Sequence, residues 1–269
     1  MFQQFNISRT GFGAYQKMLF NITNNIANSN TPGYKQTRVE LATLFPVVLS
    51  EAQAANADDE MMNPYVKKKR GVELGSGVQI TDITTDHTQG VIQPSDRPED
   101  MAINGRGFFQ YRLADGRVAY GRAGNLSRDV EGNIVDQSGH LLDPPIRLPE
   151  DVNEIRVDQE GRVSVLVRDD AVPQEIGQIL LARFPNPEGL KNIGSNLYVE
   201  SVESGEPVIN SPGENGTGVI VQNAVEGSNV DVIKEMMEMI MAQKGLELLG
   251  KAMSAGTAML RAGMSMGDK

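Results

Sequence analysis

The sequence contains no cysteine and no tryptophan, and its only histidines are His87 and His140. The absence of cysteine excludes a disulfide framework, thiol catalysis and any zinc site built on thiolates. A serine–histidine–aspartate triad needs a base held beside a nucleophile. Both histidines stand in turn-like contexts, so we interpret them as exposed loop residues. We therefore predict no catalytic residue, no cofactor and no metal site, and we expect that the protein is not an enzyme.

Long apolar runs are also missing, since no stretch approaches the roughly 20 residues of a membrane span. We therefore predict no membrane insertion. The chain carries 35 acidic and 25 basic residues, a formal net charge of −10. This balance argues against nucleic acid as a partner, because binding to phosphates needs a basic face. It favours a self-repelling subunit that associates only through specific contacts.

Apolar residues recur with a helical period near the start of the chain. A helix is predicted over residues 4–28, with one stripe made of Ile7, Gly11, Ala14, Met18, Ile22 and Asn25, widened by Leu19 and Ile26. The turn-rich segment Asn28–Gly33 predicts where this helix ends. The Asn24, Asn25 and Asn28 amides can bond the last helical carbonyls, and Gly33 permits a left-handed turn.

The helical period returns from Ser228 to about Met264, where Ser228 or Asn229 is the expected N-cap and Asp231 suits the helix dipole. One stripe forms a heptad seam of Met239, Ala242, Leu246, Leu249, Met253, Gly256 and Leu260. A second stripe holds Ile233, Met237, Met241, Leu248, Ala255 and Met259. Two stripes predict a helix covered on more than one side, either within the subunit or by neighbouring copies. The many methionines favour neighbouring copies, because flexible thioethers fill irregular interfaces.

Between the two helical regions, short alternating segments are separated by turn residues. Turns at Asp115–Gly116, Glu131–Asn133 and Gln159–Gly161 predict a train of antiparallel hairpins. The predicted fold class is α+β: an antiparallel helical hairpin of the terminal helices, a central, mainly antiparallel β domain and an extended linker region. The expected domains are residues 1–35 with 226–269 as a helical, coiled-coil core, 36–90 with 206–225 as a connector, and 91–205 as the β domain.

Four motifs carry a family resemblance. The run Asn24–Lys35, which reads Asn-Asn-Ile-Ala-Asn-Ser-Asn-Thr-Pro-Gly-Tyr-Lys, closely resembles the N-terminal signature of flagellar rod and hook proteins. Ala102–Phe109, Asn196–Tyr198 and Glu226–Asp231 resemble further family segments in the same order. The chain is therefore identified as a member of the flagellar basal-body rod protein family. Its length and its insertion at Leu41–Gly90 resemble the distal rod branch, with the proximal rod branch and hook-type axial proteins as alternatives.

The resemblance implies a structural subunit of the distal rod. Such subunits polymerise helically into the hollow drive shaft that transmits torque from the motor to the hook. The implied location is the basal body of the bacterial flagellum, in a rod that spans the periplasm. The implied partners are other copies of the chain, adjacent rod and hook-type axial proteins, surrounding ring or bushing proteins, and the flagellar type III export apparatus.

The residues that we expect at the assembly interface are those of the helical stripes and the asparagine-rich stop. They are Ile7, Gly11, Ala14, Met18, Ile22, Asn24, Asn25, Ile26, Asn28, Gly33, Met237, Met239, Met241, Leu246, Leu248, Leu249, Met253 and Leu260. The competing class outside the family is a cell-wall hydrolase. It would need a cleft carboxylate with a raised pKa, and no local pattern marks one.

Overall fold

The computed structural model describes residues 2–50, 72–149, 152–167 and 172–267. The chain divides into two compact units. Unit 1 comprises Met1–Thr23, Arg38–Thr84 and Met236–Lys269, and unit 2 comprises Asn24–Thr37 and Thr85–Glu235. Much of the predicted insertion, with its acidic and basic runs at 58–60 and 67–70, lies outside the described residues.

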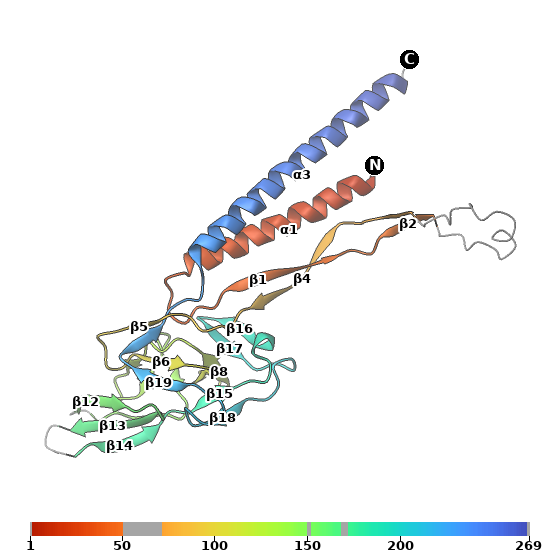
Figure 1. Cartoon of the computed structure of the whole chain (residues 1–269). Helices are drawn as coiled ribbons and strands as arrows, with labels where there is room; N and C mark the ends of the chain where they lie inside the picture. The colour runs from red at the N-terminus through yellow and green to blue at the C-terminus, as the bar shows by residue number, and fades with distance from the viewer. Residues whose placement is uncertain (1, 51–71, 150–151, 168–171, 268–269) are drawn as a thin grey trace, which may run out of the picture. The chain divides into compact units, whose positions relative to one another are not determined.

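Two long helices, α1 (Phe2–Ala27) and α3 (Val232–Gly267), form the helical part of unit 1, where they lie side by side (Figure 1). Gly11 of α1 faces Leu249 of α3, and Tyr15 faces Gly245, so the helices run in opposite directions. A Cβ atom added to Gly245 would lie 2.6 Å from the ring of Tyr15, which shows how closely the helices approach there. The predicted antiparallel helical hairpin is thus confirmed, with ends shifted by a few residues.

The rest of unit 1 is an extended ribbon (Figure 1). Strand β1 (Thr37–Thr43) pairs with β4 (Val78–Thr85), and β2 (Val47–Ser50) pairs with β3 (Val72–Leu74). Just after β1, the Leu44 amide donates a hydrogen bond of 3.0 Å to the Gly77 carbonyl, which precedes β4. This bond links the two sides of the ribbon where the β1–β4 pairing ends. The region expected to be an extended connector is therefore, in its described part, a two-stranded ribbon.

Unit 2 is built on a seven-stranded antiparallel sheet with the order β16-β17-β8-β7-β11-β10-β9. Its strands are β7 (Phe109–Arg112), β8 (Val118–Gly121), β9 (Ser127–Arg128), β10 (Ile134–Val135), β11 (Leu141–Leu142), β16 (Lys191–Gly194) and β17 (Leu197–Val199). Gly116, Gly132 and Gly161 adopt positive φ angles of 84°, 85° and 79° in the turns of three hairpins. The hairpins predicted at these turns are thus confirmed.

Smaller sheets complete unit 2. One has three strands, β12 (Val152–Val157), β13 (Arg162–Val167) and β14 (Gln174–Gln178). Three others are antiparallel pairs: β15 (Leu181–Arg183) with β18 (Val208–Asn210), β6 (Met101–Asn104) with β19 (Val219–Gln222), and β5 (Ile92–Pro94) with β20 (Ala224–Glu226). A short 3-10 helix, η1 (Pro187–Gly189), follows β15.

The core of unit 2 consists of two clusters of buried side chains. The larger includes Met101, Ile103, Phe109, Tyr111, Leu126, Val163, Leu181 and Ile220. The smaller is mainly aromatic and consists of Phe108, Tyr120, Ala182, Phe184, Leu190 and Tyr198. The smaller cluster lies beside the polar site described below, because Phe108 contacts the Arg122 guanidinium.

The compact units divide the chain differently from the expected domains. Residues 206–225, expected in the connector, supply β18 and β19, whose backbone groups pair with β15 and β6. Residues 24–35, expected with the terminal helices, fall in unit 2 with the β strands. The reason is hydrogen bonding by side chains distant in sequence, which periodicity does not report.

Gly33 illustrates how tightly the stop after α1 packs. Its φ angle is +68°, and a Cβ atom there would lie 2.5 Å from the Ala123 amide nitrogen. Its own amide donates a 2.8 Å hydrogen bond to the Glu226 carbonyl. The expected left-handed turn is confirmed, and close approach by the backbone of residue 123 adds a second reason for glycine.

We predict that Gly33→Ala destabilises unit 2 by about 3 kcal/mol, because backbone strain and overpacking add together. Gly116→Ala is the matched control: its φ is +84°, but no atom lies within 4 Å of the added Cβ. It should cost only about 1–2 kcal/mol. Denaturant unfolding followed by near-ultraviolet circular dichroism of the buried tyrosines measures both. Equal losses would contradict the packing argument.

Candidate functional site: a buried polar junction

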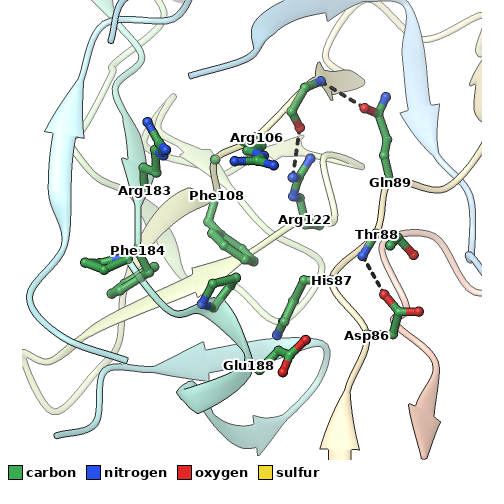
Figure 2. A pocket seen from close by; sticks show the side chains of 14 residues that line it. Asp86, His87, Thr88, Gln89, Arg106, Phe108, Arg122, Arg183, Phe184 and Glu188 are labelled. Atoms are coloured by element: carbon green, nitrogen blue, oxygen red, sulfur yellow. Dashed lines mark hydrogen bonds between the residues drawn. The ribbon is translucent and has the colours of Figure 1, made fainter. Parts of the chain in front are cut away.

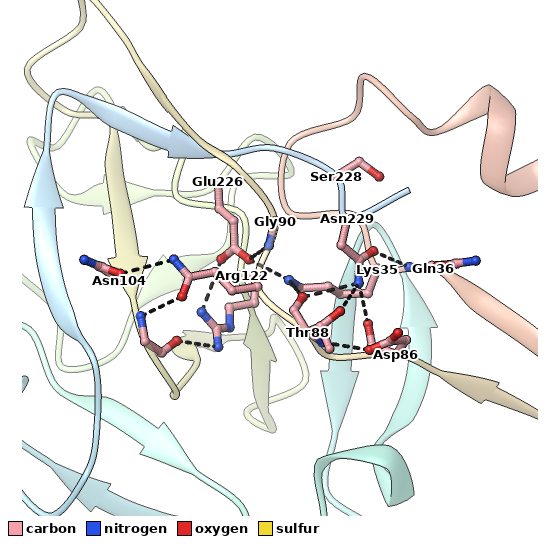
Figure 3. Close-up of polar contacts among 12 residues, drawn as sticks. Lys35, Gln36, Asp86, Thr88, Gly90, Asn104, Arg122, Glu226, Ser228 and Asn229 are labelled. Carbon is pink, nitrogen blue, oxygen red and sulfur yellow. Dashed lines mark hydrogen bonds and ion pairs between the residues drawn. The ribbon is translucent and has the colours of Figure 1, made fainter. Parts of the chain in front are cut away.

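The Glu226 carboxylate at the end of β20 is the centre of a buried polar network in unit 2 (Figure 3). One oxygen accepts from Lys35 Nζ at 2.6 Å and from the Gly90 amide at 2.9 Å. The other accepts from Arg122 Nη1 at 3.2 Å. The Glu226 and Lys35 side chains are fully shielded from solvent, and that of Arg122 nearly so. One carboxylate thus joins segments near residues 35, 90, 122 and 226.

The two cations make further contacts that offset the cost of removing them from water. Lys35 Nζ also donates to the Thr88 carbonyl at 2.6 Å. Arg122 donates to the Gly105 carbonyl at 2.9 Å, and its Cζ lies 5.3 Å from the Phe108 ring centroid. Burial lowers the pKa of Lys35 and of Arg122, while the Glu226 carboxylate opposes both shifts. The charge of Asp86 also opposes the lowering of the Lys35 pKa.

A second cluster, centred on Asn25, ties the last turn of α1 to the first turn of α3. The Asn25 amide donates to the Thr37 carbonyl at 2.9 Å and to Glu235 Oε2 at 3.3 Å. Its carbonyl oxygen accepts from the Tyr34 hydroxyl at 3.0 Å. Gln36 donates to the other Glu235 oxygen. Asn25 therefore satisfies both ends of its side chain inside unit 2.

Asn229 connects the two clusters. Its carbonyl oxygen accepts from the Gln36 amide at 2.7 Å, and its amide group donates to the Asp86 carbonyl at 2.9 Å. It is therefore not the N-cap of α3, and that expectation is wrong.

Asp231 caps the helix, since its Oδ1 accepts from the amides of Ile233 at 3.0 Å and Lys234 at 3.3 Å. Two segments, 24–37 and 226–235, together with the loop 86–90, form what we call the junction.

In the asparagine-rich stop, one of the three side-chain amides, that of Asn28, bonds a last helical carbonyl as expected. Asn28 donates to the Asn24 carbonyl and to the Asn24 side chain, both at 2.9 Å, and so closes the end of α1. Asn25 instead turns inward to Glu235. Gly33 is buried against the Ala123 backbone. The stop therefore forms part of the junction.

The expected assembly residues of the helices fall into two groups. The first group is buried or half-buried on the facing sides of α1 and α3: Ile7, Gly11, Ala14, Met18, Ile22, Ile26, Met239, Leu246, Leu249 and Met253. The second group, on α3, is exposed: Met237 at 55%, Met241 at 64% and Leu248 at 65%. Asn24 is also exposed, and the Leu260 side chain lies outside the described residues.

The two histidines lie in different surroundings. His87 is enclosed by Phe108 and Tyr198, with ring centroids 5.3 and 5.0 Å away, and among the described residues neither ring nitrogen has a hydrogen-bond partner. Burial, together with the nearby charges of Lys35 and Arg122, lowers the pKa of His87 to about 4. His140 Nδ1 lies 2.9 Å from Asp136 Oδ2. The interpretation of His87 as an exposed loop residue is wrong, because Phe108 and Tyr198 cover it. His140 lies in the loop between β10 and β11, where its side chain is half-buried.

Sequence reasoning missed the roles of Arg122, Glu226 and Glu235. A signal was present, because Lys35 closes one family motif and Glu226 opens another. Charged residues at fixed motif positions need a physical reason, and burial as a pair is one. Among the described residues, no cluster of acidic or histidine side chains could hold a metal ion. In the same part of the chain, no helix is long and apolar enough to cross a membrane.

We predict that Glu226→Gln destabilises unit 2 by about 3–5 kcal/mol, because two buried cations lose the carboxylate that they share. Glu247→Gln is the matched control, since Glu247 pairs with Lys244 and Lys251 on the exposed surface of α3. We expect little change there. Denaturant unfolding of the full chain measures both variants, and a small effect of Glu226→Gln would contradict the central role of this carboxylate.

His87 predicts a pH dependence of stability. Because its folded-state pKa is about 4 and the ordinary pKa of histidine is 6.5, the unfolded chain binds a proton between these values and the native chain does not. Stability therefore falls as pH drops from 6.5 to 4, by up to about 3 kcal/mol. His87→Phe, which removes no hydrogen bond, should flatten this slope, whereas His140→Gln should keep it. An unchanged slope in His87→Phe would refute the assignment.

Comparison with known proteins finds three matched regions, which contain part of the junction. A model described as the flagellar hook protein FlgE/F/G D1 domain matches residues 102–165, and the flagellar basal body rod FlgEFG protein C-terminal model matches residues 221–266. The model described as flagella basal body rod protein matches residues 16–35. The three regions contain Lys35, Arg122 and Glu226 of the first cluster.

Similar proteins match across nearly the whole chain. The flagellar basal-body rod protein FlgG of Buchnera aphidicola subsp. Acyrthosiphon pisum is 39% identical over 255 residues, covering 95% of this chain and 96% of that protein. FlgG of Caulobacter vibrioides is 36% identical, covering 97% of each chain, and FlgG of Bacillus subtilis is 35% identical, covering 94% of each. With this identity over almost its full length, the chain belongs to the flagellar basal-body rod protein family.

Proposed function

We propose that this protein is a structural subunit of the flagellar rod, in its distal segment, and that it acts by polymerising with copies of itself. The polymer is the hollow shaft that transmits torque from the motor to the hook. The relatives named FlgG, similar over nearly their full length, support the rod assignment. The subunit works through binding alone, without catalysis.

The observation that carries polymerisation is the second apolar stripe of α3. At 3.6 residues per turn, Met237, Met241 and Leu248 fall on one side of the helix. The heptad seam, with Ala242 and Leu246, falls on the opposite side, where the side chains are buried or half-buried. No described residue covers the exposed stripe, so a neighbouring subunit is the partner that would remove it from water. Ile233 and Met259 extend this stripe and are also exposed.

The junction fits the transmission of force within unit 2. A shaft under torque needs chain segments that do not slip past the β strands. Directional hydrogen bonds from Lys35, Arg122 and Asn25 resist slipping better than apolar contacts do, because they fix geometry as well as distance. We propose that this is why the polar groups are buried there.

The remaining partners follow from the place of the subunit in the rod. At the ends of the distal segment, adjacent rod and hook-type axial proteins would contact the same surfaces as another copy does. Surrounding ring proteins would face the outer surface of the shaft, and the type III export apparatus would deliver the subunit. Because exposed stripes would associate prematurely, we propose that the terminal helices become fully ordered only on assembly.

We predict that replacing Met237, Met241 and Leu248 with glutamine blocks polymerisation without unfolding the subunit, since all three side chains are exposed. The control replaces Gln243 and Ser254 with alanine, two exposed residues of α3 outside both stripes. Sedimentation measures the polymer, and near-ultraviolet circular dichroism of the buried tyrosines confirms folding. Far-ultraviolet circular dichroism of free and polymerised protein should show a gain in helix. If the triple variant polymerises normally, the exposed stripe is not the interface.

A further inference from the structure

A pocket of about 550 Å³ opens on unit 2 beside the junction (Figure 2). Its walls come from the segment Asp86–Gln89, the turn Gly105–Phe108, and the segment from Arg183 to Glu188. Buried Phe108 and Phe184 supply an aromatic floor. Nothing in the proposed polymerisation through α3 uses this pocket.

Positive charge gathers at one end of the pocket. In Figure 2, Arg106, Arg122 and Arg183 lie toward one end, whereas the carboxylates of Asp86 and Glu188 lie toward the other. Within the described part of the chain, the Arg106 guanidinium has neither an ion pair nor a hydrogen bond. Arg183 donates only to a backbone carbonyl, that of residue 215, at 2.8 Å.

Arg122 reaches the wall of this pocket from the buried network, where it shares the Glu226 carboxylate with Lys35. Arg122 Nε is buried without a hydrogen-bond partner. A carboxylate suits this end of the pocket, because planar guanidinium groups bind carboxylates through paired, charge-assisted hydrogen bonds.

One hairpin tip of unit 2 has matching chemistry. Val130, at the turn between β9 and β10, is 100% exposed and stands between the carboxylates of Asp129 and Glu131. Neither carboxylate pairs with a cation among the described residues: Asp129 accepts from the Val130 amide at 2.6 Å, and Glu131 only from Asn133 at 3.4 Å. Arg147 bonds the Glu131 carbonyl, not its carboxylate.

Two other acidic hairpin tips, among the described residues, are already neutralised. Asp115 pairs with Arg117 at 2.7 Å, and Asp158 pairs with Arg162 at 3.0 Å. These tips therefore have less to gain from a second arginine. The tip at residues 129–131 also shares no residue with the pocket wall.

We propose that the arginine end of this pocket receives the Asp129–Val130–Glu131 tip of a second copy of this chain. Arg106 and Arg183 bind the carboxylates, and Val130 packs against the apolar edge near Pro185. This inference rests on the proposed polymerisation. Because donor and acceptor are different surfaces of the same subunit, the contact is head-to-tail and repeats along an open polymer.

The first test is charge exchange in the full chain. Arg106→Glu and Glu131→Arg should each raise the critical concentration for polymerisation about tenfold, and the double variant should restore it, because opposite charges again meet. The control is Arg156→Glu, an exposed arginine outside the pocket. If the wild type polymerises and Arg106→Glu does so equally well, the contact is overturned while the rod function stands.

The second test does not depend on polymerisation. The probe is a synthetic peptide of residues 126–135, added to the full chain while nuclear magnetic resonance follows the His87 ring. The pKa of His87 should rise from about 4 toward its ordinary value, because the peptide carboxylates offset the charges of Lys35 and Arg122. A peptide with Asp129→Asn and Glu131→Gln should have no effect, nor should the acidic peptide on Arg106→Glu protein. No response, or an equal response to both peptides, overturns the proposal.

Discussion

The structure of unit 2 depends on one buried carboxylate. Glu226 stands at the end of β20, where it binds Lys35, Arg122 and the Gly90 amide at once. A charge buried this deeply is costly unless every lone pair is used, and here both oxygens are engaged. The same constraint fixes where the chain must go: segments remote in sequence can satisfy Glu226 only by converging on it. The Asn25 and Asn229 contacts then bind the ends of both long helices to this point.

The two ends of α3 have different roles: its first turn is held in the junction, and the rest of the helix presents two different sides. Inside unit 2, directional polar contacts hold the first turn of α3 and the last turn of α1. Farther along, α3 presents small and apolar residues to α1 on one side and Met237, Met241 and Leu248 to solvent on the other. Among the described residues, contacts within the subunit therefore cover one of the two stripes. The second remains available for a neighbour, as expected for a rod subunit.

Sequence periodicity predicts what local geometry controls. The three- and four-residue spacing from Ile7 to Asn25 identified both the helix and its buried side, and the glycines of the β turns identified the hairpins. It does not predict the junction, because Lys35, Arg122 and Glu226 are far apart in the chain and charged residues are usually exposed. The burial of His87 was not predicted for the same reason, because the rings of Phe108 and Tyr198 that cover it are distant in sequence. Asp231 displaced Asn229 as the N-cap only because Asn229 is bound to Gln36.

An apolar stripe alone does not define a rod. Hydrophobic contact is non-directional, so two copies joined only through methionine and leucine side chains can slide by a turn of helix at little cost. A subunit with a net charge of −10 also repels its copies, and that repulsion must be met locally by opposite charge. Both needs are answered by a contact that is directional and electrostatic. The arginine end of the pocket and the unpaired acidic tip at residues 129–131 have these properties, and complementary charges of this kind set register more than they add affinity. The stripe would then hold the subunits together, while the contact between β domains would set the register of each subunit against its neighbour.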